Sequence, residues 1–253
     1  MEPVRILLSG CMGQMGRVVS RLCAGRPDCL IAAGIDRQSG GVLYPVCTAA
    51  SEVSVPFDVA VDFSHPSLFE PVVGLCCARK KPLVMATTGL SDGQLERLES
   101  AAAVIPVFRS ANMSVGVNLM QLLVARAAAA LPGFDIEIIE RHHRRKVDAP
   151  SGTALMLADC INRVLPVPCE YVYDRQPLHQ GRSVHEIGIH SVRGGTIAGT
   201  HEVLFAGTDE TLTITHEASS REVFASGALR AAVWLSAQTP GLYDMQTMLS
   251  RIV

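Results

Sequence analysis

The sequence lacks any apolar run long enough to cross a membrane. No segment of the 253 residues approaches the ~18 uninterrupted apolar residues of a spanning helix, and Met1-Glu2-Pro3 does not resemble the start of a signal peptide. Charge is also sparse, at 18% of residues with a net charge of -2. That balance argues against a general binder of polyanions such as nucleic acid. We therefore predict a soluble, cytoplasmic globular protein without a membrane or nucleic-acid partner.

The sequence also lacks a cysteine or histidine framework. Its eight cysteines form no CxxC pair, and most lie among apolar residues, as in VVGLCCARK. That placement is typical of reduced core cysteines in a cytosolic protein. The histidines in SVHEIGIHSV, AGTHEV and TITHEA fall on separate strand-like segments without ligand spacing. We therefore expect no metal site.

Strand-like and helical segments alternate in the first part of the chain. The apolar runs are VRILLSG, CLIAAGID, DVAVDFSH, KPLVMATTG and IPVFRSAN, and amphipathic segments such as CMGQMGRVVSRLCAG and SDGQLERLESAAA separate them. Alternation of this kind predicts an α/β domain, in which helices cover both faces of a parallel sheet.

The pattern changes after Asn112. A long apolar helix, SVGVNLMQLLVARAAAAL, precedes the strand DIEIIE, a basic stretch and a helix from Ser151. The runs EIGIHSV, TIAGTHEVLFAG and TLTITHEA then alternate with period two, which predicts a largely antiparallel sheet, with Arg193-Gly194-Gly195 as a hairpin turn between the first two. We predict domains at 1–113 and 114–220, and a C-terminal helix over 221–253 that returns to the first domain.

A glycine-rich turn follows the first strand. The segment Gly10-Cys11-Met12-Gly13-Gln14-Met15-Gly16 lies where the pyrophosphate of a dinucleotide binds. Glycines allow a tight turn and close approach of the backbone, and the following helix start supplies N–H groups. The spacing is GxxGxxG, with Met12 in place of the middle glycine of GxGxxG. A plain tight turn would account for it as well.

Residues after the strands favour a nicotinamide cofactor. Asp36 ends the second strand, close to the ~20-residue offset at which an acid accepts the ribose hydroxyls. Arg37 can pair with the extra phosphate of NADP, or be a solvated surface arginine. Together they predict relaxed choice between NADPH and NADH. The strand ends Ala86-Thr87-Thr88-Gly89 and Ser110-Ala111-Asn112-Met113 are expected to line the nicotinamide end.

The stretch ERHHRRKVDAPSGTA, residues 140 to 154, concentrates cations before a helix start. The cations Arg141, Arg144, Arg145 and Lys146 and the pair His142-His143 precede Ser151, a favourable N-cap, with Gly152 and Thr153 in the first turn. Such an arrangement can bind a carboxylate or phosphate, and histidine can transfer protons near neutral pH. A solvated charge run is an alternative. A nucleic-acid patch is disfavoured because no aromatic residue interleaves.

Several motifs together resemble bacterial dihydrodipicolinate reductases. They are GCMGQMG, VDFSHP, ATTG, ANMSVGVN, ERHHRRKVDAPSGTA and ASSREVFASGALRAAVWL, in chain order from the first strand to the last helix. The resemblance implies a Rossmann-type nucleotide domain and an α+β substrate and oligomerisation domain, whose mixed sheet builds a homotetramer. It implies reduction of a cyclic dicarboxylate, 4-hydroxy-tetrahydrodipicolinate, by NADPH or NADH in diaminopimelate and lysine synthesis.

The resemblance also assigns roles to residues. It implies His142 as a proton donor or acceptor, Lys146 as a second catalytic residue, and His143, Ser151, Gly152 and Thr153 as substrate contacts. The implied cofactor residues are Gly10, Cys11, Met12, Gly13, Gln14, Met15, Asp36, Arg37, Ala86, Thr87, Thr88, Ser110, Ala111, Asn112 and Met113. Arg141, Arg144 and Arg145 receive no role.

Two other functions fit part of the sequence. Another two-domain NAD(P)-dependent dehydrogenase would share the nucleotide domain, although none of the candidate nicotinamide or substrate segments at 86–89, 110–113 and 140–154 holds the cysteine that an acylating aldehyde dehydrogenase needs. A non-catalytic NAD(P)H-binding redox regulator would bind the cofactor without dicarboxylate-dependent oxidation.

Overall fold

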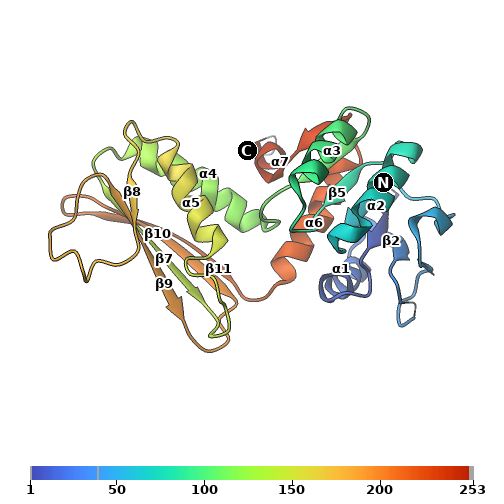
Figure 1. The fold of residues 1–253 in the computed structure, drawn as a ribbon, viewed down its shortest axis with the longest axis horizontal. Helices are drawn as coiled ribbons and strands as arrows, with labels where there is room; N and C mark the ends of the chain where they lie inside the picture. The colour runs from blue at the N-terminus through green and yellow to red at the C-terminus, as the bar shows by residue number, and fades with distance from the viewer. Residues whose placement is uncertain (1, 39, 251–253) are drawn as a thin grey trace. The chain divides into compact units, whose positions relative to one another are not determined.

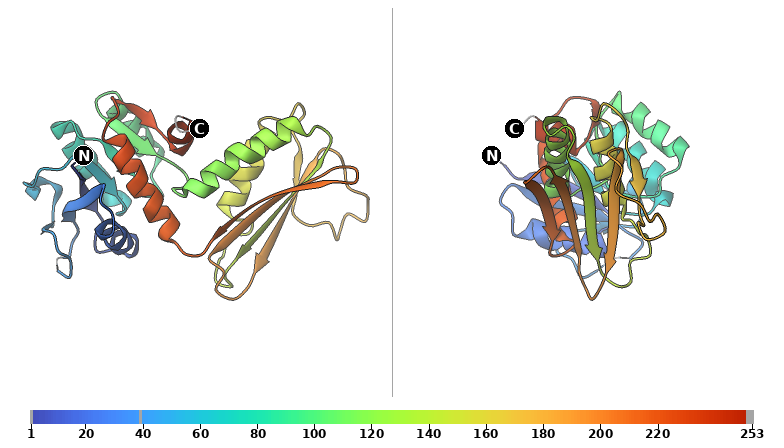
Figure 2. Two further views of the ribbon diagram at one scale, coloured as in Figure 1. Left: turned by 180° about the vertical axis from the view of Figure 1, so that it is seen from behind. Right: turned by 90° about the vertical axis from the view of Figure 1, so that its left-hand side faces the viewer.

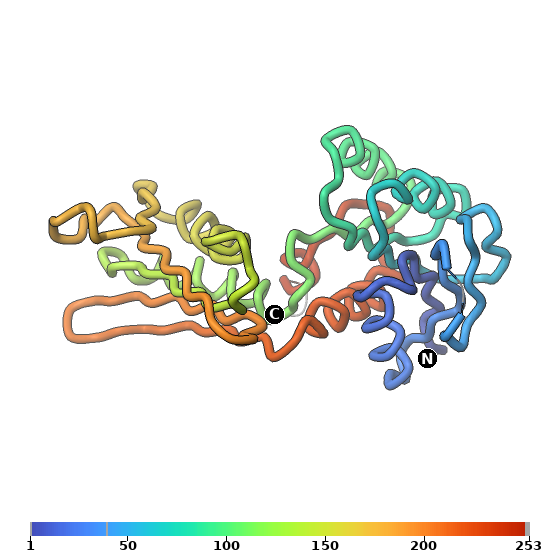
Figure 3. The backbone as a smooth tube through the Cα atoms, turned by 60° about the horizontal axis from the view of Figure 1, so that its bottom comes forward, coloured from blue at the N-terminus to red at the C-terminus, as the bar shows by residue number. Residues whose placement is uncertain are grey.

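A computed structural model describes residues 2–38 and 40–250 (Figure 1). The chain forms two compact units. The first combines residues 1–114 with 222–253, and the second comprises residues 115–221. Figure 3 shows the chain leaving the first unit once and returning to it once, so both ends of the chain belong to the same unit.

The first unit holds a parallel sheet of seven strands in the order β12-β6-β5-β4-β1-β2-β3. Its strands are β1 (Val4–Ser9), β2 (Cys29–Ile35), β3 (Val46–Cys47), β4 (Val59–Asp62), β5 (Leu83–Met85), β6 (Pro106–Arg109) and β12 (Gly241–Tyr243). Its helices are α1 (Gln14–Ala24), α2 (Phe69–Arg79), α3 (Asp92–Ala102), α6 (Glu222–Leu235) and α7 (Met245–Ser250), with short 3₁₀ turns at Ala50–Glu52 and Pro66–Leu68. This confirms the predicted α/β class.

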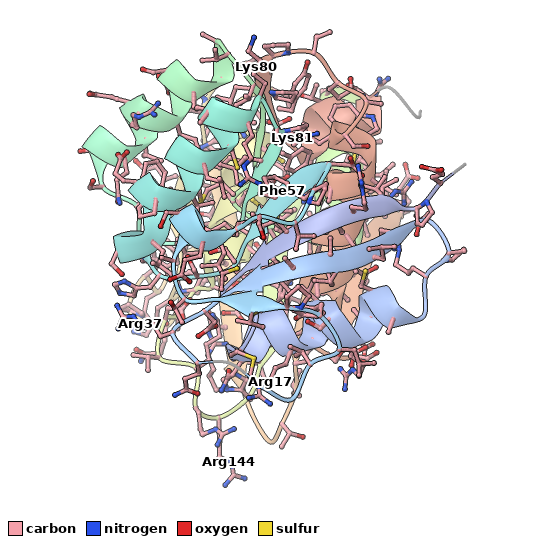
Figure 4. The ribbon with its side chains drawn as sticks, turned by 90° about the vertical axis from the view of Figure 1, so that its right-hand side faces the viewer. Arg17, Arg37, Phe57, Lys80, Lys81 and Arg144 are labelled. Carbon is pink, nitrogen blue, oxygen red and sulfur yellow. The ribbon has the colours of Figure 1, made fainter. Side chains whose placement is uncertain are left out.

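Helices cover both faces of this sheet. Figure 4 shows α2 and α3 on one side of the strands and α1 with α6 on the other. The central strands β1 and β4 are buried throughout most of their length. The core beneath α2 and α3 includes Leu7, Phe57, Phe69 and Leu83. Strands buried on both faces have continuous apolar sequences, which is why the runs in this part of the sequence do not alternate.

The second unit packs two helices on a five-stranded sheet in the order β11-β10-β7-β9-β8. The elements are α4 (Val115–Ala130), β7 (Asp135–His142), α5 (Gly152–Asn162), β8 (Glu170–Val172), β9 (Glu186–Arg193), β10 (Gly199–Ala206) and β11 (Thr211–Ala218). Both helices lie on one face of the sheet (Figure 2). The core between them includes Val124, Ile138, Leu157 and Phe205.

The strand pairing corrects one prediction. We predicted a hairpin at Arg193-Gly194-Gly195 between the strands now identified as β9 and β10, but β7 lies between them. β7 pairs in antiparallel fashion with β10 and in parallel fashion with β9. The sheet is therefore mixed, with antiparallel pairs β10–β11 and β10–β7 and parallel pairs β7–β9 and β8–β9. A glycine-rich connection suits a hairpin, but it does not decide which strands pair.

Two element boundaries also differ from the prediction. The strand DIEIIE continues through Arg141 to His142, so these residues belong to β7 and not to a loop. The segment predicted as one helix over 221–253 forms α6, β12 and α7, because Pro240 and Gly241 follow α6 and a proline cannot continue a helix. Residues 251–253 of that prediction lie outside the described chain.

Candidate active site

The glycine turn is tight at two positions. Gly10 has φ +76°, and a Cβ there would lie 2.5 Å from the Phe63 carbonyl oxygen. A Cβ on Gly16 would lie 2.1 Å from the carbonyl oxygen of Gly10. Both positions therefore require glycine. The turn leads into α1, where no side chain of the described residues caps the start at Gly13. A helix start of this kind fits the pyrophosphate of a dinucleotide.

Asp36 closes the turn from the neighbouring strand. Its Oδ2 accepts the Met12 N–H at 2.9 Å, and its Oδ1 accepts the Gln38 N–H at 3.4 Å. Cys11 is buried beneath the turn, and burial, together with Asp36, raises the pKa of its thiol to about 11. Because its side chain is buried, Cys11 can contact a cofactor only through its backbone. Arg37 reaches the surface of the unit (Figure 4).

The two later strand ends line one cavity of about 380 Å³. Its lining comprises Met15, Phe63, Ser64, Ala86, Thr87, Thr88, Ser110, Ala111, Asn112, Met113 and Phe224. The segments predicted to contact the nicotinamide thus line one cavity. Phe63, Ser64 and Phe224 also line it, although the sequence analysis did not predict them. A cavity with small polar groups and an apolar wall fits a planar ring that carries an amide.

Within that cavity the hydroxyl of Thr87 is already hydrogen-bonded to Asp62. Its hydroxyl donates to Asp62 Oδ2 at 2.9 Å, and both residues are buried. Asp62 also accepts the Ser64 N–H at 3.2 Å. Thr87 therefore holds the end of β5 against the end of β4, and it presents only its backbone and methyl group to a ligand.

In the second unit the basic stretch divides between the two faces of the sheet. Successive side chains of a strand point to opposite faces. Arg141 therefore faces away from the helices and binds Glu202, with both contacts at 3.1 Å. Glu140 and His142 share the face covered by α4 and α5. Arg144 and Arg145 are exposed beyond the end of β7 (Arg144 is labelled in Figure 4).

Glu140 is the buried centre of this site. It has no solvent exposure, and it binds His142 Nδ1 at 2.6 Å and the guanidinium of Arg193 at 2.6 and 2.8 Å. Burial alone would raise the pKa of Glu140, but the hydrogen bonds from Arg193 and His142 outweigh it and hold the pKa at about 2. Glu140 is therefore a carboxylate at neutral pH.

Neither Glu140 nor Arg193 was predicted as a site residue. The strand register explains how they meet, because Arg193 of β9 lies beside His142, and His201 of β10 lies beside Glu140. Glu140 could have been predicted from its position two residues before His142, because alternate residues of a strand lie on the same face. Nothing in the sequence pointed to Arg193 as a site residue, because it lies in the segment that we interpreted as a turn.

The predicted substrate residues surround the start of α5. Ser151 is the N-cap, and its Oγ accepts the Ala154 N–H at 3.2 Å and lies 2.9 Å from His201 Nε2. Gly152 is exposed, and apart from its chain neighbours and the backbone of its own helix, no described atom lies within 4 Å of the position of its missing Cβ. Thr153 is half-buried. This helix start can therefore receive a carboxylate.

The other two predicted residues come from the loop after β7. Lys146 Nζ donates to Asp148 Oδ2 at 2.8 Å. His143 is half-buried, and its Nδ1 has no hydrogen-bond partner among the described residues. His201 lies edge-on to His142, with the ring centroids 5.2 Å apart. The structure thus places a histidine, a buried carboxylate and a helix start side by side.

His201 should make the protein sensitive to acid. Burial, with a smaller contribution from His142, lowers the pKa of His201 to about 4, whereas the unfolded chain has a value near 6.5. Between these values the unfolded state binds more protons, so stability falls as the pH falls. We expect about 2–3 kcal/mol to be lost between pH ~6.5 and ~4. Urea unfolding of His201→Gln should show a flatter pH dependence over this range.

The matched control is His185→Gln, which changes an exposed histidine of the same unit. Its pH dependence should follow that of the unaltered protein. Equal slopes for the His201 and His185 variants would contradict this assignment.

No group of three or more His, Cys, Asp or Glu side chains that could hold a metal ion occurs among residues 2–38 and 40–250. Over the same residues, no helix is both long and apolar enough to span a bilayer.

Two family descriptions match successive parts of the chain, and the second one continues from the second unit into α6, β12 and α7 of the first. Residues 4–113 match "Dihydrodipicolinate reductase, N-terminus", and residues 116–249 match "Dihydrodipicolinate reductase, C-terminus". A "4-hydroxy-tetrahydrodipicolinate reductase" of Caldanaerobacter subterraneus subsp. tengcongensis is 50% identical over 248 residues, covering 98% of this chain and 99% of the relative. A protein of the same name from Clostridium tetani is 46% identical, covering 98% and 97%.

A solved structure is also similar. "Dipicolinate bound Dihydrodipicolinate reductase from Paenisporosarcina sp. TG-14" superposes with a TM-score of 0.82 at 28% identity, covering 96% of this chain and 97% of that one. A myo-inositol dehydrogenase from Corynebacterium glutamicum has a TM-score of 0.53 at 16% identity. That second likeness concerns the fold alone.

Proposed function

The chain belongs to the dihydrodipicolinate reductase family, and we propose that it reduces 4-hydroxy-tetrahydrodipicolinate to tetrahydrodipicolinate with NADPH or NADH, in diaminopimelate and lysine synthesis. The observation that carries the proposal is the 50% identity to a reductase of that name over 98% of the chain. The dipicolinate-bound relative supports a small cyclic dicarboxylate as the substrate.

The first unit fits a nicotinamide cofactor, which supplies a hydride when bound. The turn at Gly10 to Gly16 and the open start of α1 would hold the pyrophosphate. Asp36 lies beside the turn, where it can accept the ribose hydroxyls. The cavity at the ends of β4, β5 and β6 would receive the nicotinamide ring.

The second unit supplies anion binding and proton transfer. We propose that Ser151, Gly152 and Thr153 at the start of α5, together with His143, hold a substrate carboxylate. His142 and Lys146 exchange the proton that must reach the ring after reduction. Preorganised donors near the substrate also stabilise the negative charge that develops on it.

A coupled assay tests the function. The protein is mixed with NADPH and 4-hydroxy-tetrahydrodipicolinate, freshly made by the preceding synthase, and absorbance of the reduced nicotinamide is followed. We expect oxidation of NADPH that depends on the dicarboxylate. Cofactor binding without such oxidation would favour a redox regulator instead.

The adjacent Asp36 and Arg37 should permit both cofactors. Removing the exposed Arg37 guanidinium in Arg37→Ala should lower kcat/KM with NADPH by about tenfold relative to NADH, because a charged contact to the extra phosphate is lost. The ratio of kcat/KM values measures this. Arg97→Ala, which changes a partly exposed arginine on α3 that pairs with Glu70, is the control and should leave the ratio unchanged. The same ratio in both variants would contradict a role for Arg37.

We also propose a homotetramer and a cytoplasmic location. The helices of the second unit occupy one face of its sheet, and Val192 on β9 remains exposed, which supports association through the sheet with further copies of the chain. Eight free cysteines are compatible with a reducing compartment. Light scattering during size-exclusion chromatography tests the assembly, and a monomer would contradict it.

A further inference from the structure

Each carboxylate oxygen of Glu140 accepts hydrogen bonds from more than one donor. Its Oε2 accepts from His142 Nδ1 at 2.6 Å and from Arg193 Nη1 at 2.8 Å. Its Oε1 accepts from Arg193 Nη2 at 2.6 Å and from the Ser151 N–H at 3.1 Å. One fully buried carboxylate therefore links the proposed proton-transfer residue to the N-cap of the helix proposed to hold the substrate.

The chemistry of these donors determines the protonation of His142. An ionised carboxylate is an acceptor only, so the nitrogen that faces Glu140 must carry a hydrogen. Neutral His142 is therefore protonated on Nδ1, and its Nε2 holds the free lone pair. Nε2 lies next to Gly199, where an added Cβ would approach it to 3.0 Å.

We infer that Glu140 is a positioning residue, which fixes the ring of His142 and makes Nε2 the atom that exchanges the proton with the substrate. This inference rests on the proposed function, in which His142 transfers that proton. Glu140 itself does not enter the reaction, since Arg193 and Ser151 occupy the acceptor sites that His142 leaves.

Arg193 is the second part of this arrangement. It neutralises Glu140 and also donates to the Asp148 carbonyl oxygen at 2.7 Å, which ties the loop after β7 to the carboxylate. A buried carboxylate without that cation would take up a proton more readily, and a protonated carboxyl could donate to Nδ1. Arg193 therefore keeps Glu140 an acceptor.

Other groups around His142 do not compete for Glu140. The charged and titratable neighbours are Arg193 from β9, His201 from β10, and Lys146 and Asp148 from the loop after β7. His201 is neutral at neutral pH and binds Ser151 Oγ. Lys146 binds Asp148. Among these charged and titratable neighbours, only Arg193 shares Glu140 with His142.

Nitrogen NMR of the unaltered protein, with ¹⁵N-labelled histidine, tests the inference directly. The chain has eight histidines, and loss of one ring signal in His142→Gln identifies the residue. In the neutral imidazole form of His142, observed at alkaline pH, we expect the single ring hydrogen on Nδ1. A hydrogen on Nε2 would overturn the inference, and this result is independent of any activity.

Glu140→Gln tests the consequence for the reaction. The glutamine oxygen should stay with Arg193 Nη2 and the Ser151 N–H, because both can only donate. The amide NH₂ then faces His142 Nδ1 and Arg193 Nη1, so the hydrogen bond from Nη1 is lost. The hydrogen of His142 should then move to Nε2. We expect kcat to fall by about a hundredfold or more, with little change in KM for NADPH or the dicarboxylate.

Glu140→Asp is the conservative variant. It keeps the charge and the acceptor, so we expect the hydrogen of His142 to remain on Nδ1 and kcat to exceed that of Glu140→Gln by about tenfold. Glu202→Gln is the matched control, because Glu202 pairs with an arginine on the opposite face of the sheet. Its kcat should be unchanged.

The outcomes separate this inference from the proposed function. Equal kcat values for the Gln and Asp variants, or an unchanged position of the hydrogen in Glu140→Gln, would overturn the positioning role while His142 could still be catalytic. Unchanged turnover after removal of the His142 ring would instead overturn the proton-transfer proposal itself.

Discussion

Replacing His142 and Lys146 together with alanine should lower turnover by at least about a thousandfold. Each residue is proposed to take part in proton transfer, and a positioned acid or base typically contributes 10²–10⁴-fold. Both side chains belong to the second unit, whereas the glycine turn and the cavity of the first unit would hold the cofactor. NADPH affinity, measured by fluorescence titration, should therefore stay within about twofold of the original.

The single variants show how much each of the two residues contributes to turnover. His142→Ala leaves Glu140 ionised and bound to Arg193, so the fold of the site is retained. Lys146→Ala removes only a contact to the exposed Asp148. Arg144→Ala, from the same stretch but exposed, is the control and should retain full turnover. Unchanged turnover in the double variant would contradict both assignments.

Structural features that depend on residues close together in the chain could be predicted from the sequence. Most helices and strands from β1 to β6 follow from local apolar patterns, although the short β3 and the later β12 and α7 do not. The glycine turn follows from its place between β1 and α1. The ends of parallel strands meet at one edge of a sheet, so the segments at Ala86 and Ser110 could be assigned to a common site before their cavity was known.

Contacts between distant segments could not be predicted in this way. Glu140 and Arg193 are 53 residues apart and meet only because β7 inserts between β9 and β10. Periodicity reports which face a side chain occupies, but not which strands are adjacent. Phe224 of α6 likewise lines the cavity proposed for the nicotinamide. The packing of α6 against the sheet could not be predicted from neighbouring residues.

Gly227→Ala should destabilise the protein by about 3–5 kcal/mol. Gly227 is buried on α6, and an added Cβ would lie 1.7 Å from the Met113 carbonyl oxygen and 2.9 Å from its carbon. The obstacle is backbone, so it can be relieved only by moving α6 or the end of the segment that lines the cavity. Urea unfolding should show the loss, and NADPH affinity should fall because Met113 lines the cavity proposed to receive the nicotinamide.

The same substitution on another helix of the same unit should have the opposite sign. Gly74 lies exposed on α2, and apart from its chain neighbours and the backbone of its own helix, no described atom lies within 4 Å of the position of its missing Cβ. Alanine there removes conformational freedom from the unfolded chain without a clash, so Gly74→Ala should stabilise the protein by about 0.5–1 kcal/mol. Helix propensity is identical in the two exchanges, and only the neighbouring backbone differs. A similar change in the free energy of unfolding for both variants would show that α6 does not pack against Met113 as the structure describes.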